Sequence, residues 1–598
     1  MNYKRAVYLF SGFTFCLMYV IAGDKLSTEA KNMDYNLIFD MTFKVIGGLG
    51  IFLLGMRYMS EGLQAVAGSS LKSLIRLATN NRLMGVVTGF MVTVLVQSSS
   101  VTTVMAVGFV NSGIMRLNQA INMILGANIG TTITGWILVL KVGKYGLPIL
   151  GIAAIFYLYT KSEKMKYIAY SIMGIGMVFF GLALMKAGFK PIKEVPAFEA
   201  WFQNFDANTI TGVIGCAIAG CILTVIVQSS SATLGITIGL ATSGALNFES
   251  AAALVLGENI GTTVTALLAS IGTTTNARRA AYFHMLFNLI GVTWVIAIFY
   301  LYIPFVVSII HYAYGIEDIN AFIILKDGTK EYIHVDKGIA LTHTLFNIFN
   351  VIVFFPFTLF FANLLTKYVK DKEPKNARYL THLDFKMYDS SFAALEQSHH
   401  EINRMKRHAK DMMDNLIDFI NDSDLDEKAK LIFEREDILD KVQAEITNFL
   451  IDVLSGMLTF EQAETGKIQL MLADEYESVS DYITQVLKLL LRLKENDLLL
   501  SEKQKKALEE LHKDISNLFD LINNIDNSTN YQELLIKSNQ QGDDITKLAR
   551  TIRSNHWELL ATEKIDPLTA TMFNDIIVSY RKIKTHLVTI AEILARVK

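Results

Sequence analysis

Val96-Gln97-Ser98-Ser99-Ser100 places a polar cluster in the middle of an apolar run, Leu83 to Met115, that contains no Asp, Glu, Lys or Arg. As a single helix, the 33 residues of this run would extend roughly 50 Å at 1.5 Å per residue. The hydrocarbon core of a bilayer is only ~30 Å thick. A helical hairpin that enters and leaves on one side explains both the length and the polar centre. Its tip requires a protein interior or a wet cavity, because non-helical backbone is not tolerated in lipid.

The same five residues recur 131 positions later, at 227–231, inside a second run without charged residues, Ala207 to Phe248. Gly-Ala-Asn-Ile-Gly-Thr-Thr at 126–132 returns at the same offset as Gly-Glu-Asn-Ile-Gly-Thr-Thr at 257–263. Upstream, an offset of 126 relates two sets of glycines: Gly48, Gly50 and Gly55, and Gly174, Gly176 and Gly181. Collinear matches of this kind predict an internal repeat of helix, hairpin and helix.

Other apolar segments are long enough to span a membrane. They lie near 37–59, 117–140, 166–188, 250–272, 280–302 and 338–366, with a shorter one near 146–160. If Lys4 and Arg5 are cytoplasmic, an odd number of crossings separates the two copies, and the repeats are inverted. We therefore expect an all-α, multi-pass protein of the plasma (inner) membrane with two inverted repeats, each with a re-entrant helical hairpin, and a binding site between them.

The N-terminal run Ala6 to Ala22 fits either a cleaved signal peptide or a retained anchor helix, and both alternatives stay open. Charged residues become frequent after Thr366, and apolar residues there recur at helical spacing, which predicts a cytoplasmic helical bundle. The expected parts are 1–36, an N-terminal anchor helix or signal peptide and loop; 37–165, the first repeat; 166–370, the second repeat and final spans; and 371–598, a helical domain.

Composition excludes several classes of function. The net charge of −2 gives no basis for a nucleic-acid partner. The three cysteines lie in apolar stretches, which argues against a disulfide framework or a zinc site. No P-loop lysine motif is present, and neither serine cluster has a histidine or acid beside it that would complete a catalytic triad. We therefore do not expect an enzyme, nor a required cofactor.

The polar tips suggest an ion-binding site. Helix N-termini bind anions through free N–H groups and the helix dipole, and hydroxyl and amide oxygens can hold a monovalent cation. The candidate residues for an oxyanion and sodium are Gln97, Ser98, Ser99, Ser100, Gln228, Ser229, Ser230 and Ser231. A supporting set is Asn128, Thr131, Thr132, Asn259, Thr262, Thr263 and Glu258. Neither charge-free run holds a Lys or Arg, so the anion's charge is expected to be met by helix N-termini, hydroxyls and sodium.

Each candidate also has a purely structural interpretation. Small polar residues occur at tight helix contacts in membranes, and this suffices for a single serine but not for a duplicated tip. Glu258, an acid in an apolar segment, is a functional candidate, or lies at the membrane interface. His284-Met-Leu-Phe-Asn288 and His343-Thr-Leu-Phe-Asn347 form another pair, and hydrogen bonding between helices is favoured there over proton transfer.

The paired Gln-Ser-Ser-Ser and Gly-x-Asn-Ile-Gly-Thr-Thr elements resemble the type II sodium/phosphate cotransporters over roughly residues 37–366. The resemblance implies sodium-coupled import of inorganic phosphate, with sodium as the coupling ion and the two tips as the site. A membrane phosphate sensor and an anion channel remain alternatives. The sequence leaves open whether the protein forms a homodimer.

The tail resembles PhoU, a helical phosphate-regulatory domain, through Glu436-x-x-x-Asp440 and Glu477-x-x-x-Asp481. The resemblance implies regulation, with a cytoplasmic partner left open, and a divalent metal held by Glu436, Asp440, Glu477 and Asp481. Acids four residues apart share a helix face, which is more often only solvated. The last helix has His586 where the family pattern suggests an aspartate.

Overall fold

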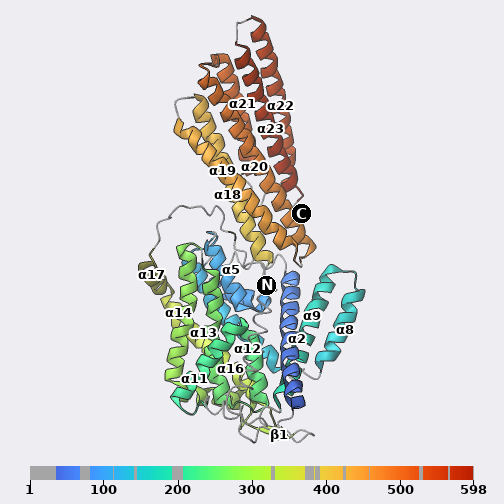
Figure 1. The fold of residues 1–598 in the computed structure, drawn as a ribbon, viewed down its shortest axis with the longest axis vertical. Coiled ribbons are helices and arrows are strands. Elements are labelled where there is room, and N and C mark those ends of the chain that lie inside the picture. Colours follow the sequence, from blue (N-terminus) through green and yellow to red (C-terminus); the bar gives the residue numbers. More distant parts are fainter. Residues whose placement is uncertain are drawn as a thin grey trace. The chain divides into compact units, whose positions relative to one another are not determined.

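The computed structural model divides the chain into two compact units, Met1–Glu373 and Pro374–Lys598 (Figure 1). The residues it describes are 35–67, 81–111, 113–140, 145–190, 206–271, 273–324, 330–370, 383, 391–421, 426–456, 458–523, 530–562 and 566–596. The signal peptide or anchor expected before residue 35 lies outside these residues. Each unit is described by itself below.

The first unit is almost entirely helical, as its apolar segments predict. Its helices are α2 (Tyr35–Ala67), α4 (Arg82–Val96), α5 (Ser99–Asn111), α6 (Leu117–Gly130), α7 (Thr132–Val139), α8 (Gly146–Tyr159), α9 (Glu163–Phe189), α11 (Ile210–Val227), α12 (Ser230–Thr242), α13 (Phe248–Ala269), α14 (Thr275–Ala297), α15 (Phe299–Tyr314), α16 (Val335–Phe354), η4 (Phe355–Phe357) and α17 (Thr358–Tyr368). Strands β1 (Phe322–Ile324) and β2 (Lys330–Tyr332) form a small antiparallel hairpin in which Phe322 pairs with Tyr332.

Seven helical segments among the described residues are long and apolar enough to cross a membrane. They are Phe39–Ala67, Leu117–Val139, Glu163–Phe189, Ile210–Val227, Phe248–Ala269, Thr275–Ala297 and Val335–Tyr368. This confirms a nearly all-helical unit with several candidate membrane spans, and the small β-hairpin is the exception to the all-α expectation. The segment Ile210–Val227 differs from the expectation, because its 18 residues, with mean hydropathy 2.5, suffice for a span by themselves, whereas the sequence suggested one arm of a hairpin.

The expected span at 280–302 is also different in the structure. The helix ends at Ala297, and a separate helix, α15, begins at Phe299. Ile298 between them has φ −109° and ψ 18°, outside helical geometry. No proline or glycine marks this break in the sequence, which is why the apolar pattern was read as one continuous segment.

The two copies of the repeat pack their helices through the same glycine contacts. A Cβ added at Gly126 of α6 would lie 1.9 Å from the carbonyl oxygen of Val86 in α4, and one at Gly257 of α13 would lie 1.7 Å from that of Ala217 in α11. Each of these residues is 131 positions from its counterpart. Only glycine permits so close an approach of two backbones, so the repeat in sequence is also a repeat in packing.

Helices α2 and α9, which begin the two copies, lie side by side and run in opposite directions (Figure 1). Gly48 faces Gly181, and Gly55 faces Gly174, with a Cβ on either α2 glycine 2.7 Å from a carbonyl oxygen of α9. In the sequence repeat, Gly48 corresponds to Gly174 and Gly55 to Gly181. The pairing in space is therefore crossed, as expected for two equivalent helices that are antiparallel.

The second unit is a bundle of long helices whose apolar sides face one another, drawn in yellow to red in Figure 1. The helices are α18 (Ser391–Asn421), α19 (Asp426–Leu454), α20 (Phe460–Glu495), α21 (Glu502–Asn523), α22 (Tyr531–Thr562) and α23 (Pro567–Leu594). In α19, Val442 and Ile446 are buried in the shared core and Ile438 packs against it, which confirms the predicted helical periodicity. Thr459 and Gln462 form a capping box that fixes the start of α20.

Candidate functional site

Both serine clusters lie at breaks between two helices. Helix α4 ends at Val96 and α5 begins at Ser99, while α11 ends at Val227 and α12 begins at Ser230. The glutamine after each first helix is left-handed, with φ 55° and ψ 27° at Gln97 and φ 54° and ψ 26° at Gln228. A left-handed conformation costs a residue other than glycine roughly 1–2 kcal/mol. Its occurrence at two equivalent positions points to a function for this geometry.

Hydrogen bonds hold each break in the same shape. The hydroxyl of Thr93 donates to that of Thr102 over 3.0 Å, and the equivalent Thr224 donates to Thr233 over 3.2 Å. Ser98 and Ser229 act as N-caps, since their side-chain oxygens accept from backbone N–H groups in the first turn of α5 and α12. Two helix N-termini, each with its dipole, are thereby fixed beside serine hydroxyls.

The two breaks, 131 residues apart, line one cavity of about 190 Å³. This is room for several water molecules. The residues that line it are Leu53, Met56, Arg57, Ser60, Val96, Gln97, Ser98, Ser100, Gln228, Ser229, Ser230 and Ser231. Seven of the eight residues predicted for the tips are therefore brought together. The exception is Ser99, which is buried at the start of α5 and is not part of the lining.

A charged residue that the sequence analysis did not single out also lines the cavity. Arg57 of α2 bonds through Nε to Oε1 of Glu61 over 2.6 Å, and the Tyr170 hydroxyl donates to the other oxygen of Glu61 over 3.1 Å. The sequence predicted that helix N-termini, hydroxyls and sodium would meet an anion's charge, and that prediction did not include this arginine beside the tips. The sequence contains a signal for Arg57, because a charged residue in an apolar span is a functional candidate by default.

The predicted supporting residues form a buried layer that does not line the cavity. Asn288 of α14 donates to the side-chain oxygen of Asn128, and Asn347 of α16 donates to that of Asn259, both over 3.3 Å. These bonds agree with the expected role of the His-x-x-x-Asn pair in joining helices. Each of the four supporting threonines is also buried: Thr131, Thr132, Thr262 and Thr263.

Glu258 lies fully inside the protein. Its side chain is 1% exposed, and neither carboxylate oxygen has a hydrogen-bond partner among the described residues. A buried carboxylate is costly unless it is paired, protonated or bound to a cation. The residue therefore stays a candidate for binding a cation or a proton.

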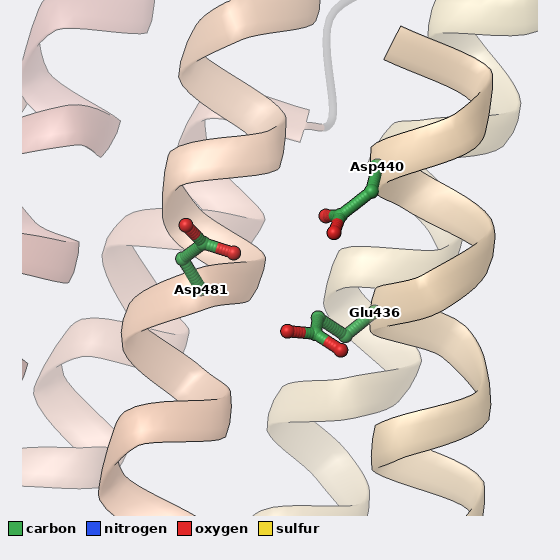
Figure 2. A group of neighbouring side chains, drawn as sticks. All are labelled: Glu436, Asp440 and Asp481. Carbon is green, nitrogen blue, oxygen red and sulfur yellow. The ribbon is translucent and has the colours of Figure 1, made fainter. Parts of the chain in front are cut away.

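In the second unit, acids from two neighbouring helices face one another (Figure 2). One carboxylate oxygen from each of Glu436, Asp440 and Asp481 lies within 4.8 Å of the other two. Oxygen atoms bound to a common hard cation such as Ca²⁺ or Mg²⁺ at ~2.0–2.6 Å fall within such a distance of one another, so the donors fit a divalent ion. Glu477, the fourth predicted ligand, is not in this group.

The charges of these acids affect one another. Burial, followed by the nearby carboxylate of Asp440, raises the pKa of Glu436 above its ordinary value. Burial and Asp440 also raise the pKa of Asp481. A cation between the helices would relieve this repulsion. His586 lies elsewhere in the bundle, where its Nδ1 is 2.8 Å from an oxygen of Glu475.

Comparison with known proteins connects both units to families. The Na+/Pi-cotransporter family model matches residues 51–187 and 193–307, and the PhoU domain model matches residues 402–490. The chain is 27% identical over 317 residues to YqeW, an uncharacterized protein of Bacillus subtilis. The aligned residues are 52% of this chain and 94% of YqeW. No solved structure matches the chain.

Two other relatives carry functional names. YjbB of Salmonella typhimurium, named provisionally as an inorganic phosphate export protein, is 24% identical over 444 residues, which are 74% of this chain and 76% of YjbB. The sodium-dependent phosphate transport protein 2A of Rattus norvegicus is 36% identical over 98 residues, which are 16% of this chain and 15% of the rat protein.

Proposed function

The chain belongs to the Na+/Pi-cotransporter family in its membrane region and carries a PhoU domain after it, and from this premise we propose that it imports inorganic phosphate together with sodium across the plasma membrane. The observation that carries the proposal is the cavity shared by the two tips. Phosphate near neutral pH is an oxyanion with one to two negative charges. Helix N-termini and serine hydroxyls are suitable donors for its oxygens.

Sodium completes the proposed site. The tips offer hydroxyl, amide and backbone oxygens that can hold sodium, and the buried Asn and Thr residues and Glu258 offer further oxygens outside the cavity lining. A bound cation would lower the cost of placing phosphate at membrane depth. By linkage, each ion should then raise the affinity of the protein for the other by the same factor.

Alternating access needs two halves that exchange roles, and we propose that the repeats are inverted, each with a re-entrant hairpin. The antiparallel pairing of α2 with α9 supports this topology. With the native cysteines replaced, a cysteine at Gly328 should react with an impermeant reagent only from outside, and one at Arg278 or Lys375 only from inside. The same sidedness at positions 278 and 328 would contradict the inverted repeat.

We propose that the PhoU domain regulates transport from the cytoplasm, through a divalent metal, a partner protein or both, and the compactness of the second unit supports an independent role. Deletion of residues 380–598 removes none of the seven candidate spans. The shortened protein should still bind phosphate but lose its response to phosphate supply. Loss of binding by a folded, membrane-inserted truncation would show that the domain takes part in the site.

The deciding experiment is uptake of labelled phosphate into proteoliposomes that contain the purified full-length protein. An inward sodium gradient should drive accumulation above equilibrium, and a potassium gradient of equal size should not. A channel would equilibrate phosphate without accumulating it, and a sensor would bind it without moving it.

The name of YjbB favours export as the rival direction. With the protein oriented as in the cell, an exporter would release preloaded phosphate faster than it takes phosphate up under physiological sodium gradients. Import would give the opposite ratio.

A further inference from the structure

Among the described residues that line the cavity, one side chain is charged, and it comes from outside both hairpin runs. Leu53, Met56, Arg57 and Ser60 follow one another at helical spacing along one face of α2, and all four line the cavity with the tips. The hydroxyl of Ser60 donates to the backbone oxygen of Val96, the last residue of α4. This bond fixes the face of α2 against the first tip, one residue before Gln97.

From this placement we propose that Arg57 is a phosphate-binding residue that gives the cavity its preference for the more highly charged anion, with Glu61 as the carboxylate that competes with phosphate for it. The inference rests on the proposed transport of phosphate. An arginine side chain has five N–H donors in a planar fork, and it binds phosphate oxygens in pairs. Its Nε already bonds to Glu61, so phosphate would take the place of a carboxylate that binds the same fork.

Glu61 is held in place by the other copy of the repeat. One of its oxygens accepts from Arg57, and the other accepts from Tyr170 of α9, whose side chain is buried. The carboxylate therefore has an orienting contact of its own, and it offers Arg57 a negative partner when no anion is present. A phosphate that enters the cavity must compete with this partner, which lowers the apparent affinity for weakly charged anions.

The repeat shows that helix packing does not require this ion pair. At the offset of 126 residues that relates α2 to α9, Arg57 corresponds to Ala183 and Glu61 to Ala187. The glycine contacts of the two helices are preserved without the charges. The Arg57 side chain is 69% exposed, and an ion pair four residues apart at such exposure contributes little to stability. Arg57 is distinguished by its position beside both tips.

The test is titration of purified full-length protein with inorganic phosphate in sodium buffer, with separate sodium binding as a check on folding. Arg57→Gln should weaken phosphate binding about tenfold or more, because it removes a charge-assisted hydrogen bond. Arg57→Lys, which keeps the charge but not the fork, should fall between. Glu61→Gln should tighten binding several-fold, a gain that damage to the fold would not produce.

The matched control is Arg82→Gln. Arg82 is exposed at the opposite end of α4 from the tip, about 20 Å along the helix axis. Wild type should favour phosphate increasingly as pH rises through neutrality and its second charge appears, and Arg57→Gln should flatten that profile. If Arg57→Gln behaves as Arg82→Gln does, or Glu61→Gln fails to tighten binding, the proposal is overturned while transport stands. If wild type itself binds no phosphate, the proposed function fails, and this inference with it.

Discussion

The two tips have nearly the same backbone but different surroundings. Gln97 is 6% exposed, and its side chain donates to Val94 and accepts from Thr134, whereas Gln228 is exposed. The cavity receives Ser230 from the second tip but not Ser99, its counterpart in the first. Duplication has thus preserved the helix packing that shapes the site, while the chemistry at each tip is set by neighbours that are not duplicated.

The largest expected effect tests the shared part of this comparison. Gly126→Ala and Gly257→Ala would each place a Cβ within 2 Å of a backbone oxygen, and neither neighbour can move without displacing its helix. Both should destabilise the protein by more than the ~1–3 kcal/mol typical of overpacking. Thermal stability of the purified protein, followed by size-exclusion chromatography, would measure the loss.

Gly50→Ala is the control for these variants, because nothing lies within 4 Å of its added Cβ. Alanine is favoured over glycine in a helix by up to ~1 kcal/mol, so this variant should be neutral or slightly stabilised. If one copy tolerated its alanine and the other did not, the difference between the copies would extend from the tips to the scaffold.

The next effect concerns the serines that differ between the tips. Ser230→Ala removes a hydroxyl that lines the cavity, and a hydrogen bond to a charged partner contributes ~1.5–3 kcal/mol. It should weaken phosphate binding about tenfold or more in sodium. Ser99→Ala, which changes a buried residue outside the lining, should change affinity much less. Calorimetry with and without sodium measures both.

Equal losses for the two serine variants would mean that the lining of the cavity does not identify the residues that bind. Phosphate affinity that ignores sodium in wild type would count against a shared site, because linked ions must affect one another. The sequence repeat alone predicts equal effects for Ser99→Ala and Ser230→Ala, whereas the cavity lining predicts a larger effect for Ser230→Ala. Measuring both variants therefore decides between these two predictions.

The sequence predicted what depends on local pattern and duplication. The polar tips, the helical breaks near Gln97 and Gln228 and the periodic core of the tail follow from motifs and hydrophobic spacing. The break at Ile298 did not, because no proline or glycine marks it. The place of Arg57 could not be predicted either, since it depends on where α2 packs against the tips, and that contact is made between segments far apart in the sequence.

The tail presents a second duplicated motif, and the comparison with the tips shows what duplication alone does not provide. Both Glu-x-x-x-Asp pairs lie on neighbouring helices, α19 and α20, yet three of the four acids converge and Glu477 does not. Asp440 and Asp481 are exposed, whereas the tips line a cavity. An exposed cluster of like charges should respond to protons and cations more weakly than a cavity does.

The smallest expected effect is therefore the pH dependence of this acidic cluster. The pKa values of Glu436 and Asp481 are raised in the folded protein, first by burial and then by Asp440. A group whose pKa is higher in the folded than in the unfolded state contributes stability below its unfolded pKa and loses that contribution as pH rises through the folded pKa. The PhoU domain should therefore become slightly more stable as pH falls from neutral into the carboxyl range. The gain should be a fraction of a kcal/mol, because solvent screens exposed groups.

At neutral pH, Mg²⁺ or Ca²⁺ should stabilise the domain in the same sense, and Glu436→Gln should reduce both responses. Glu434→Gln, an exposed change on the same helix, should leave them intact. Calorimetric unfolding of the full-length protein across pH, with and without the metal, measures these shifts. A domain that loses stability on acidification in this range, or that ignores both cations, would show that the three carboxylates form only a solvated helix face.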